Sequence, residues 1–467
     1  MPTRKPELTI NQLKDHLLHY FFNDLTQDNR LVGLELEVTP IQTDAQGNPK
    51  TVPLVTDDKM GVVDLFRSQE AEHHWYDYAP SPDGAWRFVD QLGGQITFEP
   101  GGQVEYSSAT RERLYDVVVD VATALERIQK ILAGHQNTQL YFSGLNPFHS
   151  VQDVGLQIRK ERYINMDRYF EMIGPFGQKM MRLSTSLQVN LDVGYVETAR
   201  KRWLAANLLA PVLVAGFGNS PFHEGKFTGL KSYRAKIWQN LDPSRTGFQK
   251  GFEDCAYQPC PVQQYLNFAL DASCMWLPNE QGNMTFDGHF RTFRHWMDCG
   301  FHGFYPTLEE FKKHLTTLFP EVRPRGFYEI RSIDGQPRQF WMVPGFLLTH
   351  ILYNERALDE TIALLEPIRC TLTPMMMEAA VQGMAEPDLA NLVKQVFKIA
   401  MRAAEPIEHP ELLKVTEAFL RHFTYRNWSP ADELLALNDG KIFSLGQFYD
   451  LERIHQDLVG DAFKVPV

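Results

Sequence analysis

The 467-residue chain is 43% hydrophobic and 22% charged, a composition typical of soluble globular proteins. Its 46 Lys and Arg residues against 58 Asp and Glu residues give a formal net charge of -12. Nucleic acid is therefore not expected as the main partner, because phosphate backbones are bound by basic surfaces. The length predicts two or three packed units, or one large domain with a helical appendage.

The sequence predicts neither a targeting segment nor a membrane span. The first residues, MPTRKPELTI, have no apolar core of the kind found in signal peptides. The most apolar stretch, 204–218, is short and contains Asn207 and Pro211, so we expect a buried helix there. The five cysteines are scattered without CxxC pairs or His/Cys ligand spacing, which argues against a zinc site. A reducing, cytoplasmic location and no membrane partner are expected.

The apolar periodicity predicts helices interleaved with strands, followed by a helical tail. In chain order, the first predicted elements are a helix at 7–22, a strand at 31–38, a loop at 40–60, a short helix at 81–91, a hairpin at 93–109 and a helix at 110–133. The next are a strand at 139–147, a helix at 159–173, a strand at 182–193, a helix at 196–215, mixed loop and helix at 224–256, a capped helix at 307–319 and a strand at 326–334. From about residue 342 the pattern is helical. The hairpin and the long alternating strand predict an antiparallel or mixed sheet, and hence an α+β fold.

The predicted strands carry polar side chains on one face. In LVGLELEV (31–38), Glu35 and Glu37 share a face, because successive side chains of a strand alternate. The polar faces of the other strands carry Glu99 and Glu105 in the hairpin, Gln188 and Asn190 in the long strand, and Glu329 and Arg331 in the last strand. If these faces belong to one sheet, five carboxylates converge there. Their pKa values must then rise, or a cation must lie among them.

The residue types indicate which cation and which substrate such a face would bind. All-oxygen ligands select Mg²⁺ or Mn²⁺ over Zn²⁺, and Mg²⁺ commonly takes nucleotide phosphates as further ligands. Arg331 beside Glu329 fits a phosphate clamp next to a metal ligand. The basic segment 229–248, with Arg234 and Arg245, is a second candidate for neutralising phosphates or a substrate carboxylate. Together these residues predict chemistry on a phosphorylated nucleotide.

Each of these patterns also has a purely structural interpretation. An antiparallel sheet often faces water on one side, so glutamates can mark a solvated face, although Glu is a poor strand former and four segments share the pattern. Glu329 and Arg331 could form a structural ion pair, and the basic segment could be a solvated loop and helix. Neither GxxxxGK[ST] nor GxGxxG after a strand is present, so a P-loop or Rossmann site is not supported.

Several longer motifs resemble one family. LVGLELEV, ITFEPGGQVEYSSA, MMRLSTSLQVNLDVG, PVLVAGFGNSPF, SYRAKIWQNLDPSRTG and HLTTLFPEVRPRGFYEIRSID occur in this order within roughly residues 30–345. They are similar to the plant-type glutamate–cysteine ligases and, more closely, to the bacterial branch that includes the ergothioneine-pathway glutamate–cysteine ligase. The resemblance implies a glutamine-synthetase-like catalytic fold, a curved antiparallel sheet with helices packed on one face and a concave face that holds Mg²⁺–ATP.

The resemblance also implies roles for individual residues. The metal ligands would be Glu35, Glu37, Glu99, Glu105 and Glu329. Gln188 and Asn190 would line the metal–nucleotide site, and Arg331 would contact the ATP phosphates. Arg234 and Arg245 would bind the glutamate carboxylate or phosphates. A catalytic domain at 1–345 and a helical C-terminal region at 346–467 packed on it follow from the extent of the match.

The implied reaction is ATP-dependent joining of the glutamate γ-carboxylate to the amine of cysteine, with Mg²⁺ or Mn²⁺, for glutathione or ergothioneine biosynthesis. Three alternatives stay open at this point. The acceptor could be a different amine or amino acid. The chain could be a catalytically silent binding protein that keeps the fold. It could also be a phosphotransferase that acts on a small guanidino compound.

Overall fold

The computed structural model describes residues 8–21, 28–81, 84–133, 138–254, 260–438 and 444–463. Within these residues one large sheet is formed by β1 (Val32–Thr43), β2 (Pro49–Thr51), β3 (Tyr76–Tyr78), β4 (Phe88–Asp90), β5 (Gln95–Phe98), β6 (Val104–Ser107), β7 (Gln139–Tyr141), β8 (Ser186–Asp192), β15 (Val322–Pro324) and β16 (Phe327–Asp334). The strand order is β15-β16-β8-β1-β6-β5-β4-β3, and β2 and β7 pair with the far end of β1. All pairings in this sheet are antiparallel. The predicted α+β class and antiparallel sheet are therefore confirmed.

Six short strands form small ribbons outside this sheet: β9 (Phe222–His223), β10 (Lys226–Phe227), β11 (Thr246–Gly247), β12 (Leu277–Pro278), β13 (Met284–Thr285) and β14 (Phe319–Pro320). The helices before residue 342 are α1 (Ile10–Phe21), α2 (Val62–Glu72), α3 (Leu114–Ala133), α4 (Val151–Val154), α5 (Glu161–Ile173), α6 (Phe176–Leu183), α7 (Val196–Leu208), α8 (Ala210–Phe217), α9 (Tyr233–Gln239), α10 (Pro261–Asp271), α11 (Phe293–Cys299) and α12 (Leu308–Leu315). The later helices are α13 (Val343–Leu352), α14 (Glu355–Leu365), α15 (Leu372–Gln382), α16 (Pro387–Ala404), α17 (Pro410–His422), α18 (Pro430–Asn438) and α19 (Leu445–Val459). Short 3₁₀ turns lie at Glu366–Thr371, Gly383–Ala385 and Thr424–Arg426.

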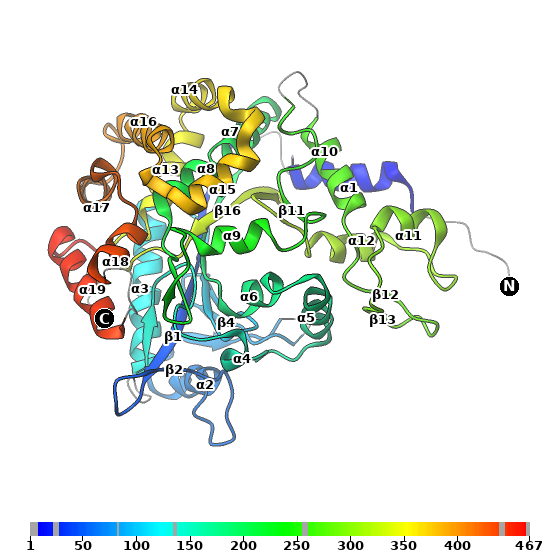
Figure 1. Ribbon diagram of the computed structural model, residues 1–467, viewed down its shortest axis with the longest axis horizontal. Coiled ribbons are helices and arrows are strands. Elements are labelled where there is room, and N and C mark those ends of the chain that lie inside the picture. The colour runs from blue at the N-terminus through cyan, green and yellow to red at the C-terminus, as the bar shows by residue number, and fades with distance from the viewer. Residues whose placement is uncertain are drawn as a thin grey trace.

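The apolar face of the sheet packs against helices and forms the main core. Leu34, Leu36 and Val38 of β1 are each only 1% exposed. Helices α3, α8 and α13 contact β1, β16 and β8 on this side. Figure 1 shows the C-terminal helices α13 to α16 gathered above the sheet and α17 to α19 along one edge. One hydrophobic cluster runs from α1 through the sheet to α19, so the helical tail shares the core of the sheet.

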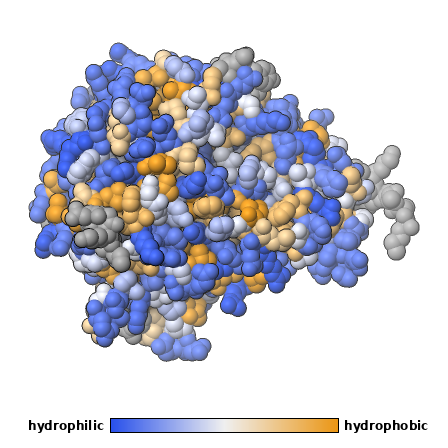
Figure 2. All heavy atoms as spheres, in the orientation of Figure 1, coloured by the Kyte–Doolittle hydropathy of each residue, from blue (hydrophilic) through white to orange (hydrophobic). Residues whose placement is uncertain are grey.

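A second, smaller core covers the opposite, polar face of the sheet. It joins α5, α6 and α9 through buried side chains that include Met166, Tyr169, Met181 and Trp238. This layer leaves a cavity between its apolar underside and the polar face of the sheet. Figure 2 shows hydrophilic residues over most of one outer face of the molecule, interrupted by hydrophobic patches. No helix within the described residues is long and apolar enough to span a bilayer.

Several sequence predictions need correction. The short helix predicted at 81–91 is wrong, because the described residues of this segment form no helix: residues 84–87 are irregular and β4 follows; residues 82 and 83 lie outside the described residues. The strand predicted at 182–193 begins only at Ser186, because α6 continues through Leu183. The helix predicted at 196–215 is divided in two at Leu209, two residues before Pro211. The loop predicted at 40–60 contains the end of β1 and β2.

Other predictions are confirmed. The hairpin at 93–109, the helix that follows it, the strand at 326–334 and the helical tail all form. The capping box between Thr307 and Glu310 begins α12, because the two side chains satisfy backbone N–H groups that the first helical turn leaves free.

Among the cysteines, Cys370 is disulfide-bonded, a state unusual in a reducing compartment. The predicted cytoplasmic location stays a prediction.

Candidate active site

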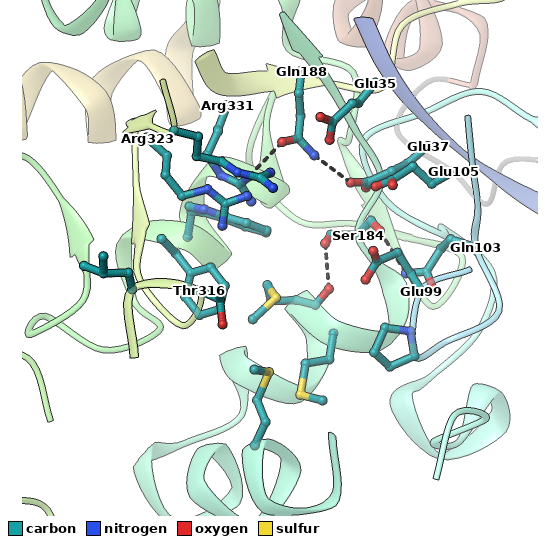
Figure 3. Close-up of a pocket in the computed structure, with 18 of the residues that line it drawn as sticks. Glu35, Glu37, Glu99, Gln103, Glu105, Ser184, Gln188, Thr316, Arg323 and Arg331 are labelled. Carbon is teal, nitrogen blue, oxygen red and sulfur yellow. Dashed lines mark hydrogen bonds between the residues drawn. The ribbon is translucent and has the colours of Figure 1, made fainter. Parts of the chain in front are cut away.

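The polar face of the sheet forms the floor of a cavity of about 480 Å³. Residues from β1, β6, β8, β15 and β16 and from the turn between β5 and β6 line it on the sheet side, and α5, α6 and α9 line it on the opposite side. Its walls include four of the five predicted metal ligands, Glu35, Glu37, Glu99 and Glu105. Figure 3 shows these four carboxylates on one side of the cavity and Arg323 and Arg331 on the other. The solvated-face interpretation is therefore wrong for these strands, because an apolar layer covers them.

Strand register brings residues that are distant in sequence into direct juxtaposition. Glu37 of β1 lies opposite Glu105 of β6, which in turn lies opposite Thr97 of β5. On the other side of β1, Glu35 lies opposite Gln188 of β8. Further along the sheet, Asn190 of β8 pairs with Glu329 of β16. A row of polar side chains therefore crosses the five strands, as expected from their alternation.

The Pro-Gly-Gly turn between β5 and β6 fixes the position of Glu99. Gly102 has φ of +91°, and its N–H donates to the carbonyl oxygen of Glu99 at 2.8 Å. A Cβ on Gly101 would lie 2.1 Å from the carbonyl oxygen of Arg182 at the end of α6. Only glycine therefore permits the turn to approach α6 so closely, and this approach closes one end of the cavity.

Hydrogen bonds orient three of the carboxylates. Glu37 accepts from the Ser186 N–H at 2.8 Å, from its hydroxyl at 2.9 Å and from Gln188 Nε2 at 3.1 Å. Glu35 accepts from Asn190 Nδ2 at 2.8 Å, and Glu105 accepts from Thr97 Oγ1 at 2.7 Å. The Oδ1 of Asn190 is buried and has no donor among the described residues. The predicted Gln188 and Asn190 thus hold the carboxylates in place.

Burial and mutual repulsion raise the pKa values of these carboxyl groups. Burial, followed by the charges of Glu329 and Glu105, raises the pKa of Glu35 to about 7. Burial and the charge of Glu37 raise the pKa of Glu105 to about 7. Burial also raises the pKa of Glu37, and it raises that of Glu99 well above the usual value, with Glu105 adding to the shift. Such a cluster is short of positive charge, and a divalent cation would supply it.

Without divalent cations, we expect the protein to lose stability as the pH rises from about 4.5 to about 7. In this range Glu35 and Glu105 bind more protons in the folded state than in the unfolded state, so the free energy of unfolding falls with pH. Saturating Mg²⁺ should flatten this slope. Thermal midpoints across the range, in EDTA and in Mg²⁺, measure the effect. A slope that Mg²⁺ leaves unchanged would contradict the predicted cation site.

Glu329 differs from the other four carboxylates because arginines surround it. Arg323 Nη2 lies 2.9 Å and Arg325 Nη1 lies 3.1 Å from one of its oxygens, and Arg331 Nη1 lies 2.7 Å from the other. Burial alone would raise the pKa of Glu329, but the Arg323 and Arg331 charges outweigh burial and hold it well below its usual value. Arg331 also donates to Gln188 Oε1 at 2.7 Å, so Gln188 connects the arginines to Glu37.

The sequence predictions did not include Arg323 and Arg325. A signal was present, because Arg325 and Gly326 form a tight turn that pairs Arg323 of β15 with Glu329 of β16. The three-residue length of β15 hid this hairpin. Three arginines, rather than one, therefore border the carboxylate cluster.

The structure places the two predicted basic residues of segment 229–248 differently. Arg234 of α9 is buried beside the cavity without lining it; it donates to the Arg331 carbonyl oxygen at 2.9 Å and stacks on Trp238, which does line the cavity. Arg245 does not line the cavity. Its guanidinium is fully buried and bonds to Asp242 at 2.8 Å and to the hydroxyl of Tyr169 at 3.0 Å. The geometry therefore joins Arg234 to the site and gives Arg245 a structural position.

Comparison with known proteins identifies the family. A family model described as glutamate-cysteine ligase family 2 matches residues 31–408. The chain belongs to glutamate-cysteine ligase family 2. It is 31% identical to the chloroplastic glutamate–cysteine ligase of Nicotiana tabacum over 74% of its own length and 66% of that protein. It is likewise 31% identical to the chloroplastic enzyme of Brassica juncea, over 74% of this chain and 67% of that one. The matched region is thus just under two thirds of the tobacco enzyme.

A solved structure shares the fold. The glutamate–cysteine ligase of Francisella tularensis, crystallised in complex with AMP, superimposes with a TM-score of 0.52. The match covers 94% of this chain and 90% of that chain at 14% sequence identity. At this identity the likeness concerns the fold alone. It agrees with the antiparallel sheet and the covering helices described above.

Proposed function

We propose that the protein is an ATP-dependent ligase that joins the γ-carboxylate of L-glutamate to the amine of L-cysteine. The observation that carries the proposal is the cavity between the sheet and the helices α5, α6 and α9. It combines four carboxylates that are short of positive charge with a cluster of arginines. Membership of glutamate-cysteine ligase family 2 supports the same reaction.

The carboxylate cluster fits Mg²⁺ or Mn²⁺. The donors are all oxygen atoms. The raised pKa values of Glu35, Glu37, Glu99 and Glu105 indicate that nearby positive charge is insufficient to stabilise their ionised forms. The unpaired Oδ1 of Asn190 is a further acceptor beside them. When bound, such a cation neutralises the ATP phosphates and the charge that develops on the transferring phosphoryl group.

The reaction needs an activated carboxylate, because a free carboxylate is a poor electrophile. Attack of the glutamate γ-carboxylate on the terminal phosphorus of ATP gives γ-glutamyl phosphate and ADP, and the cysteine amine then displaces phosphate. Arg331 and Arg323, at the rim of the cluster, supply fixed positive charge toward the phosphates. Gln188 fixes Arg331 relative to Glu37, and Arg234 holds the backbone of Arg331 through a hydrogen bond to its carbonyl oxygen. The protein thereby positions the reactants rather than forming a covalent bond with them.

The wider assignments follow from this activity. Residues 1–345 would form the catalytic unit, and 346–467 would support it through the shared core. The product would serve glutathione or ergothioneine biosynthesis in the cytoplasm, although the named plant relatives are chloroplastic. The other substrates are small molecules, so neither a nucleic acid nor a membrane partner is required.

A substrate-omission assay tests the proposed function. ADP release should require ATP, glutamate, cysteine and Mg²⁺ together, and omission of any one should reduce it to background. Mass spectrometry should then detect γ-glutamylcysteine. If ADP release requires glutamate and a different amine but not cysteine, the acceptor is misassigned. If no amine supports turnover although Mg²⁺–ATP binds, the protein is a binding protein that keeps the fold.

A further inference from the structure

Three helices of the C-terminal region bring two histidines and one glutamate together, far from the carboxylate cavity in sequence. His422 ends α17, Glu433 lies in α18, and His455 lies in α19. His422 Nε2 lies 2.6 Å from one oxygen of Glu433, and His455 Nε2 lies 2.7 Å from the other. One ligand atom from each of the three side chains lies within 4.8 Å of those of the other two.

The environment of this cluster is enclosed, but one side is open. His455 is buried with 2% exposure and contacts the edges of the Phe340 and Phe423 rings, which also contact each other. Glu433 is also buried, whereas the His422 side chain keeps 15% exposure. Burial alone would raise the pKa of Glu433, but hydrogen bonds from both histidines outweigh it and lower the pKa to about 2. Glu433 is therefore an anionic ligand at neutral pH, and His422 lies on the route from solvent.

A neighbouring carboxylate completes the set of groups that such a centre needs. The Nδ1 of His455 is buried and has no partner among the described residues. Glu452, one turn earlier on α19, lines the same small cavity as His455 and Glu433, and its buried Oε1 also has no partner there. An imidazole that binds a metal through Nε2 carries its proton on Nδ1 and usually donates it to a carboxylate or carbonyl group. Glu452 does not bond to this nitrogen in the structure, but it is a carboxylate in the same cavity that could accept the proton after a side-chain rotation.

We propose that His422, Glu433 and His455 form a divalent transition-metal site, with Zn²⁺ as the best-matched ion, that fastens the C-terminal helices together. Two imidazole nitrogens and one carboxylate oxygen form a donor set typical of zinc with one open position, which water would fill. Metal–ligand bonds of roughly 2.0–2.2 Å place neighbouring ligand atoms roughly 3.3 Å apart, so small side-chain rotations from the present contacts admit the ion. A short His/Cys motif could not reveal this site, because its three ligands come from three separate helices.

Metal uptake by the full-length chain tests the proposal. Chelator-treated protein is saturated with Mg²⁺, so that the carboxylate cavity is occupied, then incubated with Zn²⁺ and desalted before metal analysis. We expect about one Zn²⁺ per chain in the wild type and less than about one tenth of that in His455→Gln. His350→Gln is the matched control, since buried His350 bonds to Glu408 at 2.9 Å and, among the described residues, the other bond to that carboxylate comes from the backbone N–H of His409 and not from a second imidazole. It should retain the full amount.

Two further measurements test the metal site even if the buried substitution His455→Gln prevents folding. Co²⁺ bound to the wild type should give visible absorption bands of a four-coordinate centre, and the partly exposed His422→Gln should abolish them. Glu452→Gln should weaken Zn²⁺ binding by roughly 10- to 100-fold if it orients His455. The proposal would be overturned if the wild type took up neither Zn²⁺ nor Co²⁺, or if folded His422→Gln took up as much metal as the wild type. The three side chains would then only connect the helices through hydrogen bonds. Neither result depends on ligase activity.

Discussion

Glu37→Gln is expected to lower the rate of ADP release by about 10²- to 10³-fold while the protein stays folded. Glu37 lines the cavity and receives three hydrogen bonds from Ser186 and Gln188 that aim its carboxylate into the cluster. Glutamine keeps the size of the side chain and one acceptor oxygen, but it removes the negative charge that a cation requires. Because burial disfavours that charge, the metal-free variant should unfold at an unchanged or higher temperature.

Asp192→Asn is the matched control for this substitution. Asp192 ends β8 on the same face of the sheet as Gln188 but does not line the cavity, and it accepts from the Leu31 N–H at 2.9 Å. Its neutralisation should leave turnover within a few fold of the wild type. The rate of ADP release as a function of Mg²⁺ concentration should separate the two variants. Wild-type turnover by folded Glu37→Gln would refute the metal-binding role of this face.

Glu329→Gln is expected to reduce turnover by about 100-fold and to raise the KM for ATP, for a reason that the sequence did not reveal. Three guanidinium groups converge on Glu329. Loss of its charge leaves Arg323, Arg325 and Arg331 without the anion that holds them in position, and removal of one partner of a buried ion pair is costly. The guanidinium groups should then no longer be held where they can contact the ATP phosphates.

A matched glutamate distinguishes this effect from general damage to the sheet. Glu321 is also buried, but it accepts from the hydroxyl of Ser332 at 2.6 Å and does not line the cavity. Glu321→Gln should therefore keep the KM for ATP close to that of the wild type. If Glu329→Gln instead changes only the Mg²⁺ dependence and not the KM for ATP, Glu329 acts as a metal ligand, as the family resemblance first implied. An unchanged rate would contradict both roles.

Local sequence patterns predicted the carboxylates because their spacing follows the period of a strand. The alternation around Glu35 and Glu37 and the turn chemistry of Pro-Gly-Gly are each readable within ten residues. Both features recur in the structure as β1 and the β5–β6 hairpin. The prediction that their polar faces meet depended on the assumption of one sheet, which the strand order confirms.

Apart from the short hairpin that carries Arg323 and Arg325, the features that were missed depend on contacts between distant segments. Arg245 was predicted to be a ligand-binding cation, but the Tyr169 hydroxyl and the Thr317 carbonyl oxygen, both more than 70 residues away, bind its guanidinium together with the nearby Asp242. The apolar roof of the cavity requires α5, α6 and α9 to pack together, which no short pattern reports. The His422 cluster likewise joins three helices. Non-local packing decides whether a charged side chain faces a cavity or a buried partner, and a single sequence contains little information about it.

The most direct test of the proposed chemistry follows an oxygen atom from glutamate. Glutamate labelled with ¹⁸O in its γ-carboxylate is incubated with ATP, cysteine, Mg²⁺ and the protein, and the released phosphate is analysed by mass spectrometry. Formation of γ-glutamyl phosphate predicts that each phosphate carries one ¹⁸O atom, because the attacking carboxylate oxygen leaves with it. Formation of γ-glutamylcysteine together with unlabelled phosphate would contradict this account.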